Sequence, residues 1–193
     1  MDINVLLFPD FTAMDFIGPV EVLQRIPEFR IRYISMKGGL VGNKEGLTIV
    51  TEPLSAINKG ILLIPGGMGT RPAALDDEFI RKIRTVAEES VYVLTICTGA
   101  VLLGRTGLLD GKKATSNKIA MAWVEVTCPK VQWQHSARWV RTGSIYTASG
   151  VTAGMDMALG FIADQYGKAK AMDIARRMEY VWNDDAGRDP FAV

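Results

Sequence analysis

A cysteine stands at the abrupt end of an apolar segment, and this position favours nucleophilic chemistry. The segment Val91–Ile96 stops at Cys97, which is followed by the small residues Thr98, Gly99 and Ala100. Small residues let a strand and a helix pack closely in a sharp turn, which lifts a nucleophile into the crevice of an α/β sheet. Because a helix N-terminus favours negative charge, we expect the thiolate of Cys97 to be stabilised and its pKa to be lowered.

The two cysteines have different prospects. Free cysteine is among the most buried residue types, so a purely structural role for Cys97 stays open. Cys128 precedes Pro129 in a loop and has no such turn around it. We therefore expect Cys97, and not Cys128, to be the reactive thiol.

Asp15 is the second candidate for chemistry. It follows the first apolar segment and has apolar neighbours on both sides, with Glu21 one turn further along as a weaker candidate. An acid in this place either caps the helix or faces the crevice. In the crevice, desolvation and a neighbouring thiolate would both raise its pKa, and the protonated carboxyl could act as a general acid.

Bare backbone follows another apolar segment, at Pro65-Gly66-Gly67. Amides without a neighbouring Cβ can point at a developing oxyanion. A tight turn with no functional role is the alternative interpretation. The nearby elbow at Cys97 favours the functional interpretation.

The elements that must position these residues alternate between strand and helix. Ile3–Phe8, Gly60–Pro65 and Val91–Ile96 are apolar on both faces, as strands are when helices cover both sides of a parallel sheet. Sites in such sheets lie beyond the carboxyl ends of the strands. Asp15, Gly66 and Cys97 follow three of these ends. Further strands are predicted over Phe29–Ser35, Val131–Gln134, Ala137–Val140 and Ile145–Ser149, with a hairpin in Lys37–Thr51, and helices from about Pro19 to Arg25 and over Asp76–Glu89, Thr98–Leu109, Ile119–Val126, Thr152–Tyr166 and Ala169–Trp182.

Composition narrows the classes of function. The chain has 193 residues, a net charge of +1 and 48% hydrophobic residues, which predicts one globular domain over residues 1–193. No basic block suggests a nucleic-acid partner, and no apolar run approaches the ~20 residues that span a membrane. Two cysteines without a CxxC pair, together with one histidine, are too few ligands for a zinc or iron–sulfur site. We expect a reduced, cytoplasmic, metal-free protein, since the N-terminus has no secretory pattern.

Several segments, in order and spacing, resemble the DJ-1/PfpI (ThiJ) superfamily, and the resemblance spans nearly the whole chain. They are Phe8-Pro9, Asp15–Leu23, Ile64–Gly67, Ile96–Ala100, Gly107–Thr115 and Ser149–Leu159. Within the superfamily the Asp-x-x-Gly-Pro and Cys-Thr-Gly segments are most similar to the isocyanide hydratase branch and to the amidotransferase-like sensor domains of AraC-type regulators.

The resemblance implies a flavodoxin-like three-layer sandwich that is homodimeric and uses no cofactor. By the same resemblance, Cys97 is the nucleophile and Asp15 is the acid that holds its sulfur and relays protons. The backbone amides of Gly67 and Thr98 look like the oxyanion-binding pair. Gly66, Gly150 and Val151 look like pocket residues.

The chain departs from its relatives in histidine. Asn117 stands where relatives often carry a histidine after Ala114-Thr115, and Thr98 stands where protease-like members place a histidine after the nucleophile. The one histidine, His135, is predicted to lie on the surface. A peptidase or amidase that needs imidazole as its base is therefore disfavoured.

Three functions are consistent with this pattern. The first is a cofactor-independent enzyme in which Cys97 attacks a small electrophile and Asp15 moves the proton, as in isocyanide hydration. The second is a non-catalytic small-molecule or redox sensor domain. The third is glyoxalase III or deglycase-like action on α-oxoaldehydes, whose family members more often use Glu and His.

Overall fold

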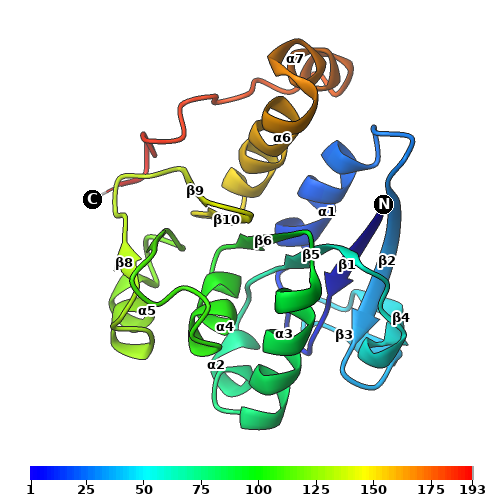
Figure 1. The fold of residues 1–193 in the computed structure, drawn as a ribbon, viewed down its shortest axis with the longest axis vertical. Helices are drawn as coiled ribbons and strands as arrows, with labels where there is room; N and C mark the ends of the chain where they lie inside the picture. Colours follow the sequence, from blue (N-terminus) through cyan, green and yellow to red (C-terminus); the bar gives the residue numbers. More distant parts are fainter. Residues whose placement is uncertain (193) are drawn as a thin grey trace.

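The computed structural model describes residues 1–192 and contains an eight-stranded sheet between two layers of helices (Figure 1). The strand order is β3-β4-β2-β1-β5-β6-β10-β9. The inner strands run parallel, and β3 and β9 pair antiparallel at the two edges. The strands of this sheet are β1 (Asp2–Leu6), β2 (Arg30–Ser35), β3 (Gly39–Gly42), β4 (Thr48–Pro53), β5 (Gly60–Ile64), β6 (Tyr92–Ile96), β9 (Trp139–Thr142) and β10 (Ile145–Ala148).

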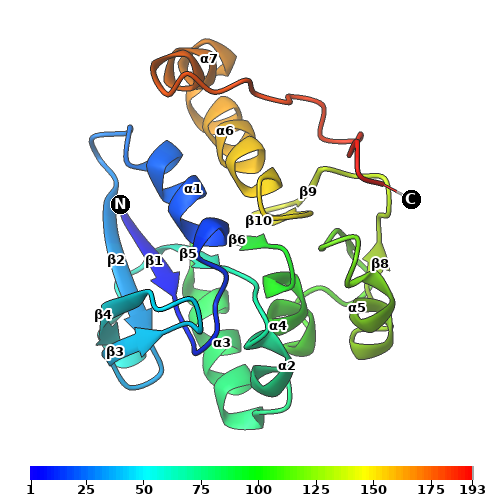
Figure 2. The same cartoon turned by 180° about the vertical axis from the view of Figure 1, so that it is seen from behind.

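The helices divide between the two faces of the sheet, as Figures 1 and 2 show from opposite sides. One layer holds α1 (Ala13–Leu23), α6 (Ala153–Tyr166) and α7 (Lys168–Arg177), and the other holds α2 (Thr70–Ala73), α3 (Asp77–Glu89), α4 (Gly99–Arg105) and α5 (Met121–Thr127). A short 3₁₀ turn (Leu54–Ala56) and a two-stranded pair, β7 (Lys113–Ala114) with β8 (Gln132–Trp133), complete the fold. The flavodoxin-like three-layer prediction is confirmed.

Burial explains the central strands. Every residue of β1 and β5 is buried, and four of the five residues of β6 are. Strands covered on both faces need apolar side chains on both faces. The order of the strands changes direction at β1, which pairs in parallel with β2 on one side and with β5 on the other. Such a switch point is where open α/β sheets place their sites.

Helix α1 begins earlier than the sequence predicted. It starts at Ala13 and carries Pro19 in its interior. Proline cannot donate to the carbonyl four residues before it, and in this helix that carbonyl belongs to Asp15. Packing offsets the lost hydrogen bond, because α1 lies close against α6: a Cβ at Gly154 would stand 3.0 Å from Cγ of Pro19.

Two helices end earlier than predicted because the backbone turns left-handed. Helix α4 stops at Arg105, short of Leu109, and Gly107 has a φ of 83°. Helix α7 stops at Arg177, short of Trp182, and Glu179 has a φ of 52°. A left-handed residue ends a helix. None of the helices in residues 1–192 is both long and apolar enough to cross a bilayer.

The start of α4 touches the backbone that leaves β5. A Cβ at Gly99 would lie 2.4 Å from the carbonyl oxygen of Ile64 and 2.6 Å from that of Pro65. Rigid backbone atoms cannot give way as the end of a side chain can. Glycine at position 99 is therefore required for α4 to begin directly behind the sheet.

We expect Gly99→Ala to lower the free energy of unfolding by about 1–3 kcal/mol, because overpacking against backbone is destabilising. Urea denaturation measures the change. Gly187→Ala is the matched control: its Cβ would find its nearest atom, Oδ1 of Asp185, at 3.5 Å. The control should stay within about 0.5 kcal/mol of the wild type. Equal stability of the two variants would contradict the close approach described for Gly99.

Candidate active site

Cys97 occupies a strained turn between β6 and α4. Its φ is 56°, a left-handed value that a residue with a Cβ rarely adopts. Hydrogen bonds hold the backbone of Cys97 on both sides. The Cys97 amide donates to the carbonyl oxygen of Ala148 at 3.1 Å, and Oγ of Ser116 donates to the carbonyl oxygen of Cys97 at 2.7 Å. The structure thus has the nucleophile elbow that the sequence predicted.

Glycine lets the chain after β5 approach this elbow. A Cβ at Gly66 would stand 2.6 Å from the amide nitrogen of Thr98 and 2.9 Å from Oδ2 of Asp15. The absence of a side chain at Gly66 therefore lets the segments that carry Thr98 and Asp15 both approach this point. The pocket role predicted for Gly66 is consistent with this position, although its main contribution is the space it leaves.

Asp15 faces inward from the first turn of α1 and is fully buried. Its Oδ2 accepts a hydrogen bond from the amide of Gly66 at 2.8 Å. Its Oδ1 finds no hydrogen-bond partner within the described part of the chain. The Cys97 side chain lies near enough to the carboxyl to lower its pKa. Of the two roles left open for Asp15, the structure shows the crevice and not the helix cap.

Burial dominates the electrostatics of both groups. It raises the pKa of Asp15 from its ordinary value of 3.8 to about 7, against the lowering effects of the Gly66 amide and the Cys97 thiol. The same desolvation, reinforced by the negative charge of Asp15, raises the pKa of Cys97 to about 12. The predicted direction for Asp15 and its desolvation cause agree with this, whereas Cys97 lowers the pKa of Asp15 and does not raise it as expected.

The lowered pKa predicted for Cys97 is wrong. Cys97 is only 7% exposed. Helix α4, whose N-terminus was expected to lower the pKa, is short and has only seven residues. The amide and hydroxyl of Thr98 and the amide group of Asn117 do lower the pKa of Cys97, but these effects are smaller than the cost of burying the charge. At rest the site holds a neutral thiol beside a carboxyl whose burial favours its protonated form.

The amides predicted to bind an oxyanion differ in availability. The amide of Thr98 lies near enough to the Cys97 sulfur to lower its pKa. The amide of Gly67 instead donates to Oγ1 of Thr98 at 3.1 Å, and that hydroxyl also lies 3.0 Å from Oγ1 of Thr70. The structure therefore uses Gly67 to fix the Thr98 side chain, and the oxyanion role expected for the Gly67 amide does not match this geometry.

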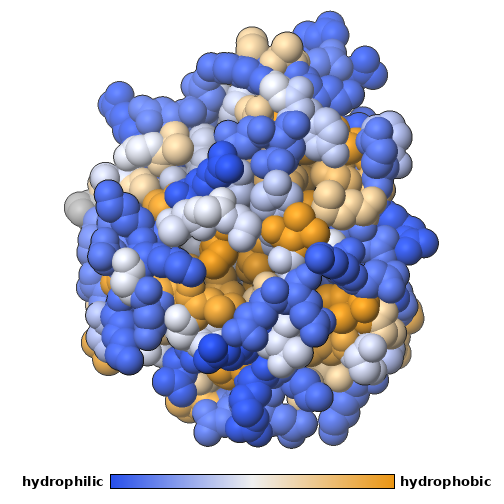
Figure 3. All heavy atoms as spheres, viewed as in Figure 1, coloured by the Kyte–Doolittle hydropathy of each residue, from blue (hydrophilic) through white to orange (hydrophobic). Residues whose placement is uncertain are grey.

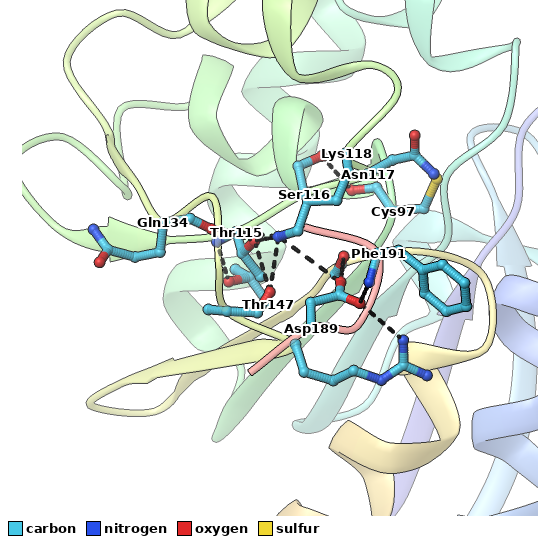
Figure 4. Close-up of polar contacts among 12 residues, drawn as sticks. Cys97, Thr115, Ser116, Asn117, Lys118, Gln134, Thr147, Asp189 and Phe191 are labelled. Carbon is cyan, nitrogen blue, oxygen red and sulfur yellow. Dashed lines mark hydrogen bonds and ion pairs between the residues drawn. The ribbon is translucent and has the colours of Figure 1, made fainter. Parts of the chain in front are cut away.

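Asn117 is the site residue that sequence reasoning undervalued. Its side-chain amide acts on the Cys97 sulfur as a hydrogen-bond donor, and Figure 4 shows the two groups side by side. Oδ1 of Asn117 accepts from the amide of Ala120 at 3.1 Å, which turns Nδ2 toward the sulfur. The signal in the sequence was its position, in place of the histidine of relatives. Asparagine supplies a donor there that does not titrate.

Gly150 and Val151 follow β10 and border the open side of the site. Both line a cavity of about 290 Å³ that also includes Asn117, and Val151 lines a second cavity of about 360 Å³ on its other side. Apolar side chains gather in the middle of the face drawn in Figure 3, over the region where β6 gives way to α4. A hollow of about 400 Å³ beside Phe8, Pro72 and Phe79 contains none of the predicted site residues.

The remaining candidates lie apart from the site. The Cys128 thiol is buried, donates to the carbonyl oxygen of Val101 at 3.6 Å, and has a pKa that burial raises to about 11. His135 is exposed and lies 2.8 Å from Oε1 of Glu125. Glu21 is exposed beside Arg25. No group of three or more His, Cys, Asp or Glu suited to a metal ion occurs in residues 1–192.

Known proteins resemble this chain in sequence and in fold. The sequence profile of the DJ-1/PfpI family matches residues 1–164. The chain belongs to the DJ-1/PfpI family. Two solved structures are similar to it: a ThiJ/PfpI family protein from Pseudomonas syringae, with a TM-score of 0.82, 29% identity and coverage of 98% of this chain and 77% of that one, and Drosophila melanogaster DJ-1beta, with a TM-score of 0.79, 20% identity and coverage of 94% and 98%.

Curated relatives within the family differ in function. Isonitrile hydratase of Pseudomonas putida is 30% identical over 184 residues, which are 93% of this chain and 78% of the hydratase. The transcriptional regulator CdhR of Pseudomonas aeruginosa is 28% identical over 182 residues, which are 91% of this chain and 54% of the regulator. The chain therefore spans about half the length of that regulator.

We expect Asp15→Asn to stabilise the protein at neutral and alkaline pH. A raised carboxyl pKa costs no stability at pH values well below 3.8, where Asp15 is protonated whether folded or unfolded. The cost grows as pH rises toward 7 and reaches up to about 4 kcal/mol above it. Asparagine keeps the acceptor for Gly66 and removes the titration. Urea denaturation at pH 5 and pH 8 should show a larger gain at pH 8, whereas exposed Asp77→Asn should show no such pH dependence.

We expect alkylation of Cys97 by iodoacetamide to keep accelerating above pH 9, where a free thiol of pKa ~8.5 has nearly levelled off. Mass spectrometry follows the rate, in a Cys128→Ser background so that one thiol reports. Asp15→Asn removes the neighbouring negative charge and should increase the rate at pH 8. A midpoint below pH 8.5 in the wild type would contradict the effect of burial.

Proposed function

We propose that this protein is an enzyme that hydrates isocyanides to N-substituted formamides, with Cys97 as nucleophile and Asp15 as the proton carrier. One observation carries the proposal: a buried thiol and a buried carboxyl share a site, and no imidazole lies near them. An isocyanide carbon accepts a sulfur nucleophile and then needs a proton from an acid. The pair supplies both. The hydratase of Pseudomonas putida supports the same reaction by similarity.

In the first step sulfur attacks the terminal carbon of the isocyanide. The Asp15 carboxylic acid gives its proton to that carbon, and the carboxylate takes the thiol proton in exchange. The product is a thioimidate, R–N=CH–S, bound to Cys97, and Asp15 is again protonated. Because no net charge is created in the buried site, the step avoids the penalty that opposes a free thiolate.

In the second step water adds to the thioimidate carbon. One water proton passes to nitrogen through the Asp15 carboxyl, and the proton of the new hydroxyl returns to sulfur as the carbon–sulfur bond breaks. The formamide R–NH–CHO leaves and the thiol is restored. The sum is isocyanide plus water giving formamide, with no cofactor.

Two donors act on the sulfur while it loses its proton. The amide of Thr98 and Nδ2 of Asn117 both favour negative charge on sulfur. Their effect is greater as charge develops than in the resting thiol, which is the condition for lowering the barrier. We assign both a stabilising role in the attack.

The other functions are less well supported. A redox sensor needs an exposed thiol of low pKa, whereas Cys97 is buried and its pKa is raised. Action on α-oxoaldehydes by analogy with relatives would use a histidine near the cysteine, where this chain has Asn117. A small-molecule sensor domain, as suggested by similarity to CdhR, stays the alternative. The homodimer stays a prediction.

We expect the wild type to convert an aryl isocyanide to its formamide, followed by loss of isocyanide absorbance and by mass spectrometry of the product. Cys97→Ser should abolish turnover and Asp15→Asn should lower it by about 10²–10⁴-fold, as loss of a general acid does. Asn117→Ala should lower kcat by about tenfold or more. Cys128→Ser serves as the control and should keep the wild-type rate.

The dependence of kcat/KM on pH tests the role of Asp15 as an acid. Because Asp15 acts in its protonated form, kcat/KM should fall as pH rises through about 7. No turnover by a folded wild type whose Cys97 is still alkylated would refute the enzyme and favour the sensor. A rate that increases through pH 7 would remove the acid role from Asp15.

A further inference from the structure

The segment 183–192, here called the C-terminal strap, lies along the edge strand beside the site. The carbonyl oxygen of Ala186 accepts the amides of Arg138 at 2.8 Å and Trp139 at 3.2 Å, and the amide of Asp189 donates to the carbonyl oxygen of Ser136 at 2.6 Å. Figures 1 and 2 both show the strap descending from α7 past β9. Backbone pairing therefore fixes the strap over this side of the molecule.

Asp189 anchors the strap in the interior. Its side chain is 1% exposed and accepts hydrogen bonds from Oγ of Ser149 and from Nη1 of Arg138, the latter at 3.4 Å. Nζ of Lys118 lies 3.9 Å from Oδ2 of Asp189, and Figure 4 shows these two side chains pointing toward each other. A buried carboxylate with cations and a hydroxyl around it holds its geometry tightly.

The anchor also orients Phe191. The amide of Phe191 donates to Oδ1 of Asp189 at 3.1 Å, while its side chain is left 70% exposed. Figure 4 shows the ring turned away from the Asp189 cluster, toward the side of the view that holds Asn117 and the Cys97 sulfur. The ring is therefore placed by a buried group although it packs little itself.

One cavity of about 290 Å³ lies between the strap and the segments that follow β7 and β10, and Asn117 is the residue through which it borders the site. Its wall includes Asn117, which reaches the sulfur, and apolar side chains from Ile119, Val151 and Phe191. An apolar cavity of about 150 Å³ in another protein holds benzene, so a cavity of about 290 Å³ has room for a substituent the size of a ring.

The charged groups on the wall of this cavity are paired. Asp189 faces Lys118 and Arg138, and Arg138 is also paired with Asp156, whose Oδ2 lies 2.7 Å from Nη2. Binding a charged substituent there would disturb a buried ion network. A neutral substituent leaves it intact.

We propose that this cavity holds the nitrogen substituent of the substrate, and that Phe191 is the residue that selects it: the preferred substrate is a neutral isocyanide with an apolar substituent of about one ring. Asp189 is a positioning residue that acts through Phe191. The inference rests on the proposed function for its reaction, but the cavity and its occupant are tested separately below.

A second cavity gives the matched control. On the other side of Val151, about 360 Å³ is lined by Met14, Leu47 and Met68 together with Lys44 and Glu45. Met68 is apolar and 54% exposed, comparable with Phe191. Among the described residues, none that lines this second cavity forms a hydrogen bond with the Asn117 side chain or the Cys97 sulfur.

The first experiment measures kcat and KM for cyclohexyl and n-propyl isocyanide. Phe191→Ala should increase KM for the cyclohexyl compound at least tenfold and change that for the propyl compound less than threefold, with kcat of both within threefold. Asp189→Asn should shift KM in the same direction. Met68→Ala should change neither ratio. Equal losses on both substrates, or a selectivity change in Met68→Ala alone, would overturn the assignment.

Charge selection is tested with isocyanoacetate and its methyl ester. The wild type should show at least tenfold higher kcat/KM for the neutral ester. A preference for the anion would refute a neutral binding cavity.

Alkylation tests the cavity without turnover. The ratio of Cys97 alkylation rates by N-benzyl iodoacetamide and by iodoacetamide should fall at least threefold in Phe191→Ala and stay constant in Met68→Ala. If the wild type turns over no isocyanide while this ratio falls, the proposed reaction fails and the cavity assignment stands. An unchanged ratio overturns the role of Phe191.

Discussion

At Cys97 the chain takes a left-handed conformation at the junction of a buried strand and a helix, and the surrounding structure has to keep it there. Such a residue costs about 1–3 kcal/mol. Hydrogen bonds to Ala148 and from Ser116 hold the backbone, and glycine at positions 66 and 99 allows the neighbouring chain to come within contact. The turn is therefore held by contacts from β10, from the segment after β7 and from the turn after β5.

The same crowding determines the chemistry. Keeping water away makes both the thiol and the carboxyl reluctant to ionise, so the site stores protons and not charge. A mechanism that passes one proton from sulfur to carbon suits such a site better than one that begins with a free thiolate. The burial of Asp15 lowers the stability of the fold when the carboxyl is ionised, as is common for groups positioned for catalysis.

Much of the arrangement could be predicted from the sequence because it depends on local patterns. The apolar segments at 3–8, 60–65 and 91–96 are strands since both faces are covered, and Cys97-Thr98-Gly99 is an elbow since only small residues fit there. What failed depended on distant partners. The Gly67 amide was assigned to an oxyanion, but the hydroxyl of Thr98, 31 positions away, takes it.

The prediction of a lowered pKa for Cys97 failed for a related reason. Helix position can be read from the sequence, whereas the depth of burial depends on the whole fold, and burial proved the larger effect. Pro19 likewise stays inside α1 because α6 packs against it. Asn117 was noticed only as a departure from the relatives' histidine, and its contact with Cys97 came from the fold. No sequence pattern links Asp189 to position 97, so the anchoring of the strap could not be predicted.

The pairing of the strap with β9 has a consequence for association between molecules. Strand β9 is an edge of the eight-stranded sheet, and an edge strand presents unpaired amides to which another chain could add. At Arg138 and Trp139, just where β9 begins, those amides already bond to Ala186. Proteolysis within residues 183–192 would bare this edge, so nicked molecules would be the ones that aggregate through their sheets.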